Sequence, residues 1–209
     1  MAGGLFLTRR QQDDQEEAGS LQAGMAALCH VRKLGAVWHC RGFIELLRWF
    51  MPVEIRAATL EDAGAISALN ADLQQIHADA HPWRFKPPRP YTFTEKDAKE
   101  LLSGPNHFAF LAFDEEAPIG YLVGEIIRRP ETARQFAHEL IYVHEISVRP
   151  DARRKGVGRL LLDNAKAHGL SLGIPMVALD TWSFNEGALR FFQENGLVPF
   201  NVRLWHNGE

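Results

Sequence analysis

The most informative stretch of this sequence is RRKGVG at residues 153–158. It follows an apolar run, residues 142–148, and opens a stretch of helical character, residues 159–168. Main-chain amides in the first turn of a helix have no intrahelical partner and lie at the positive end of the helix dipole, so they attract anions. Glycines at positions 156 and 158 let the backbone approach a ligand closely. The stretch therefore predicts a binding site for a phosphorylated ligand.

Two common phosphate-binding loops do not fit these residues. No Gly-Lys-Ser/Thr sequence follows, as a nucleotide triphosphatase requires, and a dinucleotide-binding loop needs one more glycine. The three adjacent cations at residues 153–155 instead suit a pyrophosphate or a ribose phosphate, because charge-assisted hydrogen bonds to such groups are strong. Basic turns before helices also occur without any ligand, so the loop alone does not assign a function.

Further motifs lie on both sides of the loop. They are VEIRAA at residues 53–58, ISVRP at 146–150, LDTWSFN at 179–185, Phe191-Phe192, and NGL at 195–197. In this order and spacing, the segments resemble the first strand, motif A and motif B of the GNAT superfamily of acetyl-CoA-dependent N-acetyltransferases. The resemblance covers residues 53–206.

The resemblance implies an α+β fold, layered like an α/β protein. A central mixed, mostly antiparallel sheet is flanked by helices and splayed between the strands of motifs A and B, with acetyl-pantetheine in the gap. The periodicity of the apolar residues agrees, since it predicts a helix between Thr59 and Pro82 and a strand pair at residues 108–113 and 120–128. The expected order is strand, two helices, three strands, helix, strand, helix and a last strand.

Acetyl-CoA is the co-substrate that the resemblance implies, with no metal. Backbone groups of the motif A strand would bind the pantetheine arm, and the asparagine of motif B would bind it from the other side. The implied cofactor-binding residues are Ile146, Ser147, Val148, Arg153, Arg154, Lys155, Gly156, Val157, Gly158, Arg159, Asn185, Phe191 and Phe192.

Three residues are candidates for the general base that an ammonium acceptor needs before it can attack a thioester. His144 stands where the polyamine-acetylating branch carries a glutamate, and Asp180 stands where ribosomal-protein acetyltransferases carry one. Glu145 lies on the same strand as His144, and alternation is expected to send the two to opposite faces. The competing interpretation of each is structural, because polar side chains on strands often bond to nearby backbone or face solvent.

Phe192 departs from the family pattern. Many GNAT enzymes have a tyrosine at this point of motif B that protonates the departing thiolate, and a phenyl ring cannot do so. Water, Tyr121 or Tyr142 would then serve, or the thiolate leaves unprotonated. The two cysteines, Cys29 and Cys40, lie far from the motifs, so direct transfer in a ternary complex is expected rather than an acetyl-enzyme.

Aromatic residues in the loop after the first helix are candidates for the acceptor pocket. Trp83, Phe85 and Tyr91 would line it, or they simply cap the core. The acceptor is a small-molecule amine or a peptide. Two other functions remain open: a catalytically weak acyl-CoA-binding regulatory module, favoured by Phe192, and a protein N-terminal acetyltransferase, which needs an open groove at this loop.

Composition limits the partners and the compartment. The 209 residues carry a formal net charge of -3, so nucleic acid is not an expected partner. No apolar stretch approaches the roughly 18 to 20 residues of a membrane span, and an acidic N-terminus disfavours a transit peptide, so the expected location is the cytoplasm. A homodimer is left open.

The first 51 residues differ from the rest. Residues 1–20 are polar and acidic, and residues 25–50 are apolar without a clear period. We expect residues 1–51 to be an extension that is poorly ordered or not native, with Met51 as the true start, and residues 52–209 to be the N-acetyltransferase domain. Cys-His neighbours in the extension lack zinc-finger spacing, so no metal site is expected there.

Overall fold

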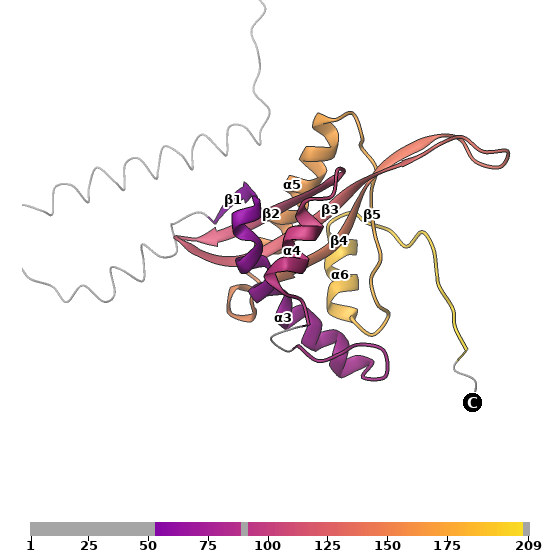
Figure 1. Cartoon of the computed structure of the whole chain (residues 1–209). Coiled ribbons are helices and arrows are strands. Elements are labelled where there is room, and N and C mark those ends of the chain that lie inside the picture. Colours follow the sequence, from indigo (N-terminus) through magenta and orange to yellow (C-terminus); the bar gives the residue numbers. More distant parts are fainter. Residues whose placement is uncertain (1–52, 89–91, 207–209) are drawn as a thin grey trace, which may run out of the picture. The chain divides into compact units, whose positions relative to one another are not determined.

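The architecture is that of a computed structural model, which describes residues 53–88 and 92–206 (Figure 1). The division of the chain at residues 51 and 52 concerns residues outside these ranges, and it stays a prediction. The same holds for Tyr91, one of the three residues expected at the acceptor pocket.

Five strands form one mixed sheet in the order β1-β2-β3-β4-β5. The first four are antiparallel neighbours, and β5 runs parallel to β4. This sheet confirms the expected fold class. The strands are β1 (Glu54–Ala57), β2 (His107–Asp114), β3 (Ala117–Arg129), β4 (His138–Val148) and β5 (Val177–Leu179).

Alternation along the strands builds one core on each face of the sheet. On one face, Leu111, Tyr121 and Val123 pack with residues of α3 (Ala63–Ala80) and α4 (Glu95–Leu102). On the other face, Leu122 and Val143 pack against α5 (Val157–Ser171). The result is a sheet between two layers of helices, as Figure 1 shows.

A threonine with a capping box precedes each helix on the first face. Thr94 accepts a hydrogen bond from the Asp97 amide at 3.2 Å, and the Asp97 carboxylate accepts one from the Thr94 amide, which forms a capping box. A 3-10 turn, η1 (Leu60–Asp62), leads from Thr59 into α3. Its Asp62 side chain bonds to Arg56 at the end of β1.

The sheet splays between β4 and β5, as expected. Three residue pairs join the two strands, and the last of them is Val143 with Leu179. β4 continues to Val148, but no residue of β5 pairs with it beyond Val143. The backbone of β4 after Val143 therefore has no strand beside it on the β5 side, which makes this the place where a ligand can enter the sheet.

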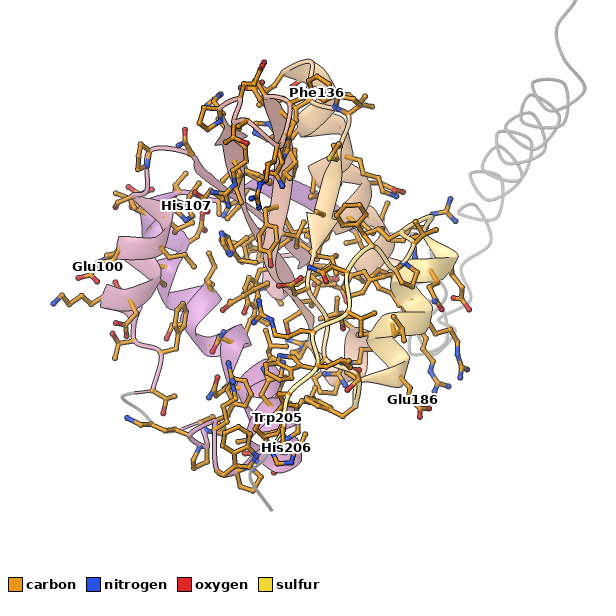
Figure 2. The ribbon with its side chains drawn as sticks, turned by 90° about the vertical axis from the view of Figure 1, so that its right-hand side faces the viewer. Glu100, His107, Phe136, Glu186, Trp205 and His206 are labelled. Carbon is orange, nitrogen blue, oxygen red and sulfur yellow. The ribbon has the colours of Figure 1, made fainter. Side chains whose placement is uncertain are left out.

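The prediction of a last strand after the final helix is wrong. After α6 (Glu186–Glu194), residues 197–206 form no strand. Their apolar residues alternate as in a strand, but Phe200, Val202 and Leu204 are largely exposed because no neighbouring strand covers them. Trp205, which is labelled in Figure 2, stacks on Trp83 instead. The ring centroids are 4.7 Å apart.

The helices of the described residues carry no candidate membrane span, since none of them is both long and apolar enough to cross a bilayer.

Candidate functional site

A cavity of about 860 Å³ lies at the gap between β4 and β5. Four elements contribute to its walls: α3, the second half of β4, the start of α5, and α6 with the segment before it. It is lined by all three candidate bases and by most of the expected cofactor-binding residues: Ile146, Ser147, Val148, Arg153, Arg154, Gly156, Val157, Gly158, Arg159, Asn185, Phe191 and Phe192. Lys155 and Trp83 are not among the lining residues.

The loop expected to bind a phosphorylated ligand, residues 153–158, which we call the anion cradle, leads into α5 with Gly156 in a left-handed conformation. Its φ is 81°, and a side chain added at this position would meet no atom within 4 Å. The helix begins at the next residue, and the Leu160 amide bonds to the Gly156 carbonyl at 3.0 Å. The amides of the first turn lie at the positive end of a 15-residue helix, where Gly156, Val157 and Gly158 line the cavity, and this position suits a phosphate group.

Arg153 ties the cradle to the end of β4. Its Nε donates a hydrogen bond to the carbonyl oxygen of Val148 at 2.9 Å. The rest of the guanidinium lies at the cavity, where its remaining N–H groups can bind an anion. Arg154, with a φ of 61°, is one of two non-glycine residues with positive φ in the described chain, so the loop takes a strained turn beside the cavity.

The start of α6 closes the other side of the gap. Asn185 caps this helix, since its Oδ1 accepts a hydrogen bond from the Ala188 amide at 3.0 Å. Its amide group is the part that remains to donate to a ligand. Phe191 packs against the cradle, because a side-chain carbon at Gly158 would lie 3.2 Å from its ring, while Phe192 is only 7% exposed.

A β-bulge at His144 changes the expected direction of the candidate bases. β3 and β4 pair Val123 with Glu145 and Gly124 with Val143, which leaves His144 as the extra residue. Glu145 bonds to Tyr121, and His144 contacts Glu125, both on the same face of β3. The expectation that alternation separates the two candidates is therefore wrong, because the bulge interrupts the alternation between them.

Glu145 is fixed in the cavity wall by two donors. Its Oε2 accepts hydrogen bonds from Tyr121 Oη at 2.8 Å and from Asn70 Nδ2 at 3.1 Å. Asn70 also donates to Tyr121 Oη at 3.0 Å, so the three side chains form a closed triangle. Burial, followed by the charge of Glu145, raises the pKa of Tyr121 well above its ordinary value. Tyr121 is fully buried and committed to Glu145, so it positions that carboxylate and cannot reach a departing thiolate.

His144 has a different set of neighbours. Its Nε2 lies 3.0 Å from Glu125 Oε2, and its ring lies 5.0 Å from the ring of Tyr142 and 5.7 Å from that of His107. About a third of its side chain is exposed, at 33%. An imidazole held by a carboxylate is suited to accept a proton, so the geometry keeps His144 as a second candidate base.

Asp180 is paired with Tyr142 across β5 and β4. Burial, the hydrogen bond to Asp180 and the negative charge of Asp180 raise the pKa of Tyr142 to about 12, and Arg203 opposes this shift. Tyr142 is therefore protonated at neutral pH and donates to Asp180. This pairing makes Asp180 a partnered carboxylate at the mouth of the gap.

Aromatic rings line the end of the cavity away from the cradle. The His77 ring stacks on Phe85 at 5.0 Å, and Phe85 meets Trp182 at a steep angle at 5.3 Å. Burial, and secondarily the charge of His81, lowers the pKa of His77, which favours the neutral ring. Trp83 lies outside this wall, 61% exposed. Of the two expected acceptor residues that the structure describes, Phe85 is therefore the one in the cavity.

Several residues of the site were not expected from the sequence. Asn70, Glu125, His77 and Trp182 hold or line the candidate base region and the aromatic wall, and Tyr121, which the sequence suggested only as a proton donor to the thiolate, holds Glu145 instead. One of them had a usable signal: Asn70 interrupts the apolar stripe of α3 and is 5% exposed, and a buried amide requires partners. The others depend on contacts between strands or helices that are distant in sequence.

Comparison with known proteins gives a family match over most of this domain. The family model described as "Acetyltransferase (GNAT) family" matches residues 70–197. Solved structures share the fold at low identity. A tetramutant of the BH1408 protein from Bacillus halodurans is 21% identical, with 73% of this chain and 98% of that chain covered and a TM-score of 0.70.

Two further similar structures are aminoglycoside acetyltransferases. AAC(6')-Iy in complex with CoA is 20% identical, with a TM-score of 0.58 and coverage of 75% of this chain and 94% of that chain. The enzyme meta-AAC0020 from an uncultured soil metagenomic sample, in complex with sisomicin, is 18% identical, with a TM-score of 0.55 and coverage of 75% and 97%. At this level of identity, the similarity shows a common fold.

Proposed function

This chain belongs to the acetyltransferase (GNAT) family, and from that premise we propose that it is an N-acetyltransferase that moves the acetyl group of acetyl-CoA directly to a primary amine. The observation that carries the proposal is a single cavity that joins an anion cradle to three candidate bases. A binding module would need the cradle, but it would have no use for a carboxylate held by two buried donors in the same cavity.

In this proposal, one end of the cavity binds CoA and the other end receives the amine. At one end, the first-turn amides of α5 and the guanidinium of Arg153 bind the phosphates of CoA. The splayed backbone of β4 and the amide of Asn185 then hold the pantetheine arm on its way to the gap. The thioester lies beside Glu145, and the amine enters from the aromatic end. Complexes of similar proteins with CoA support this assignment of the co-substrate.

Glu145 is the proposed general base. It takes a proton from the ammonium of the acceptor, directly or through water, and the free amine then attacks the thioester carbonyl carbon. The new C–N bond forms as the C–S bond breaks, and its electron pair leaves with the CoA sulfur as a thiolate. The second amine proton passes to solvent. Phe192 offers no proton to the sulfur, so the thiolate leaves unprotonated or takes a proton from water.

The acceptor is proposed to be a small primary amine with an apolar or aromatic body. His77, Phe85 and Trp182 provide a flat wall of rings for that body. Of the carboxylates that line the cavity, Glu145 and Asp180 lie near the gap and Glu194 lies near the end of α6. Such a spacing suits one ammonium at the thioester better than a polycation spread along the wall.

Release of free CoA from acetyl-CoA, measured with a panel of amines, tests this function. The panel contains aralkyl amines, linear polyamines and aminoglycosides. We expect the wild type to release thiol with an aralkyl amine. In Glu145→Gln the rate should fall by about 10²-fold or more, while the affinity for acetyl-CoA stays unchanged. Acetyl-CoA binding without thiol release from any amine would instead favour the regulatory module, and an unaffected Glu145→Gln rate would transfer the role of base to His144.

A further inference from the structure

Three polar side chains meet on adjacent strands, and one of them is His144, the second candidate base. His107 begins β2, Glu125 lies on β3, and His144 is the bulge residue of β4. The cross-strand register places His107 opposite Glu125, and the bulge turns His144 toward the same carboxylate. Each residue offers one ligand atom, and the three atoms lie within 4.8 Å of one another.

The donor set is that of a metal site. Two imidazole nitrogens and one carboxylate, with a further position open to water, are a ligand combination that Zn²⁺ uses in proteins. Ligand atoms on a tetrahedral zinc lie about 3.3 Å apart, given bond lengths of about 2.0 to 2.1 Å. His144 Nε2 and Glu125 Oε2 are already 3.0 Å apart. All three ligand atoms lie within 4.8 Å of one another, so side-chain movements of about 1.5 Å or less would bring them to the distances that an ion requires.

One ring nitrogen of His107 has no hydrogen-bond partner within the described protein. Across residues 53–88 and 92–206, His107 Nδ1 is the one buried side-chain nitrogen or oxygen without a hydrogen-bond partner. An unmet buried polar atom of this kind costs free energy and calls for a reason. Around the other two ligands the site is open, since the Glu125 and His144 side chains are 30% and 33% exposed, so an ion can enter from solvent.

From this arrangement we propose that His107, Glu125 and His144 bind a divalent transition-metal ion of the zinc class, and that the bound ion inhibits the enzyme. His144 also lines the large cavity, so an ion on its imidazole places positive charge beside the path of an ammonium acceptor. Binding of the ion does not depend on the proposed function, whereas inhibition rests on it. The sequence could not predict the site, because its three ligands are separated by 18 and 19 residues along the chain.

The probe is Co²⁺, which reports its coordination through visible absorption, and the protein is the full chain without a polyhistidine tag. We expect one Co²⁺ per chain with a tetrahedral or five-coordinate spectrum that Zn²⁺ abolishes by competition. His107→Phe keeps a flat ring beside His144 but removes the ligand, and Glu125→Gln removes the charge at nearly the same size. Each substitution should weaken cobalt binding at least about tenfold.

His138→Phe is the matched control, since His138 bonds to the backbone of Phe136 in the β3–β4 hairpin, outside the cluster. It should keep the cobalt affinity of the wild type. Equal affinity in the wild type, His107→Phe and Glu125→Gln would overturn the proposal, as would the absence of any cobalt spectrum. A spectrum dominated by thiolate charge transfer would assign the metal to Cys29 or Cys40 and would overturn it too.

The rate of acetyl transfer tests the inhibition separately from metal binding. Without metal, His107→Phe should acetylate the acceptor at the wild-type rate, because His107 does not line the cavity. With Zn²⁺ added, the wild type should lose activity and recover it with a chelator, while His107→Phe should be inhibited only at about tenfold or more higher zinc. Cobalt binding together with zinc-insensitive turnover would retain the site and overturn the inhibition. Inactivity of every protein would contradict the proposed function instead.

Discussion

Glu145 is held in position by two neighbouring side chains, Asn70 and Tyr121. Asn70 and Tyr121 donate to the same carboxylate oxygen, and they also bond to each other. The phenol is fully buried, and its pKa is raised well above the ordinary value, so it acts only as a fixed donor. Loss of either partner would leave a buried polar atom unmet and a carboxylate free to rotate.

Tyr121→Phe removes this donor and keeps the ring in the core. We expect a loss of about 1 kcal/mol in the free energy of unfolding, and a fall in kcat with little change in KM for acetyl-CoA. Urea unfolding and steady-state kinetics measure the two effects. A purely structural role would lower stability and leave kcat unchanged, which would contradict the positioning of Glu145.

At the scale of elements, the junction of β1 with α3 depends on an ion pair. Arg56 and Asp62 form two hydrogen bonds, of 2.8 and 2.7 Å, in a forked geometry. The hydrogen bond to Arg56 is the largest cause that lowers the pKa of Asp62 from 3.8 to about 2, and burial opposes the shift. The exposed Arg56 side chain limits the stabilisation, since solvent screens such pairs.

Asp62→Asn should lower the free energy of unfolding by about 1 kcal/mol at neutral pH. Because the folded pKa is the lower one, the carboxylate stabilises the fold fully above 3.8, and this contribution is lost as the pH falls toward 2. The difference between wild type and variant in urea unfolding should therefore shrink over this window. A difference that stays constant from about pH 7 down to about pH 2 would contradict the linkage.

The aromatic wall joins α3, the loop after it and the segment after β5. Trp182→Ala should raise KM for an aralkyl amine about tenfold or more and leave the affinity for acetyl-CoA unchanged, because the ring contacts Phe85 rather than the cradle. Phe136→Ala is the control: Phe136 is 86% exposed at the far end of the domain from Trp205 (Figure 2). Equal KM values in both variants would remove Trp182 from the acceptor site.

The elements were predictable from the sequence, whereas contacts between them were not. Local signals such as the proline at position 82 and the glycine at position 156 limit the helices, and in the structure α3 ends at Ala80 and α5 begins at Val157. The bulge at His144 depends on pairing with β3, so alternation within β4 gave the wrong faces. The prediction of a last strand failed for the same reason, since residues 197–206 have the apolar alternation of a strand but no neighbouring strand to pair with.

In the whole molecule, the proposed function of the cavity depends on one ligand, acetyl-CoA. The cradle, the splay of β4 from β5 and the fixed carboxylate are useful together only if acetyl-CoA spans the cavity from α5 to Glu145. A substitution at Gly156 tests this claim best, because its left-handed backbone leaves open space where a phosphate would lie. Gly173 provides a matched control, with a similar φ of 74° and no atom within 4 Å of an added side chain.

Calorimetric titration of acetyl-CoA into the wild type, Gly156→Glu and Gly173→Glu is the most direct measurement. Both substitutions impose a similar backbone strain, of about 1 kcal/mol, but only the first places a carboxylate in the cradle. The account predicts binding at a one-to-one ratio with a Kd of about micromolar for the wild type and Gly173→Glu, and none for a folded Gly156→Glu. Equal affinity in all three proteins, or no binding by the wild type, would contradict it.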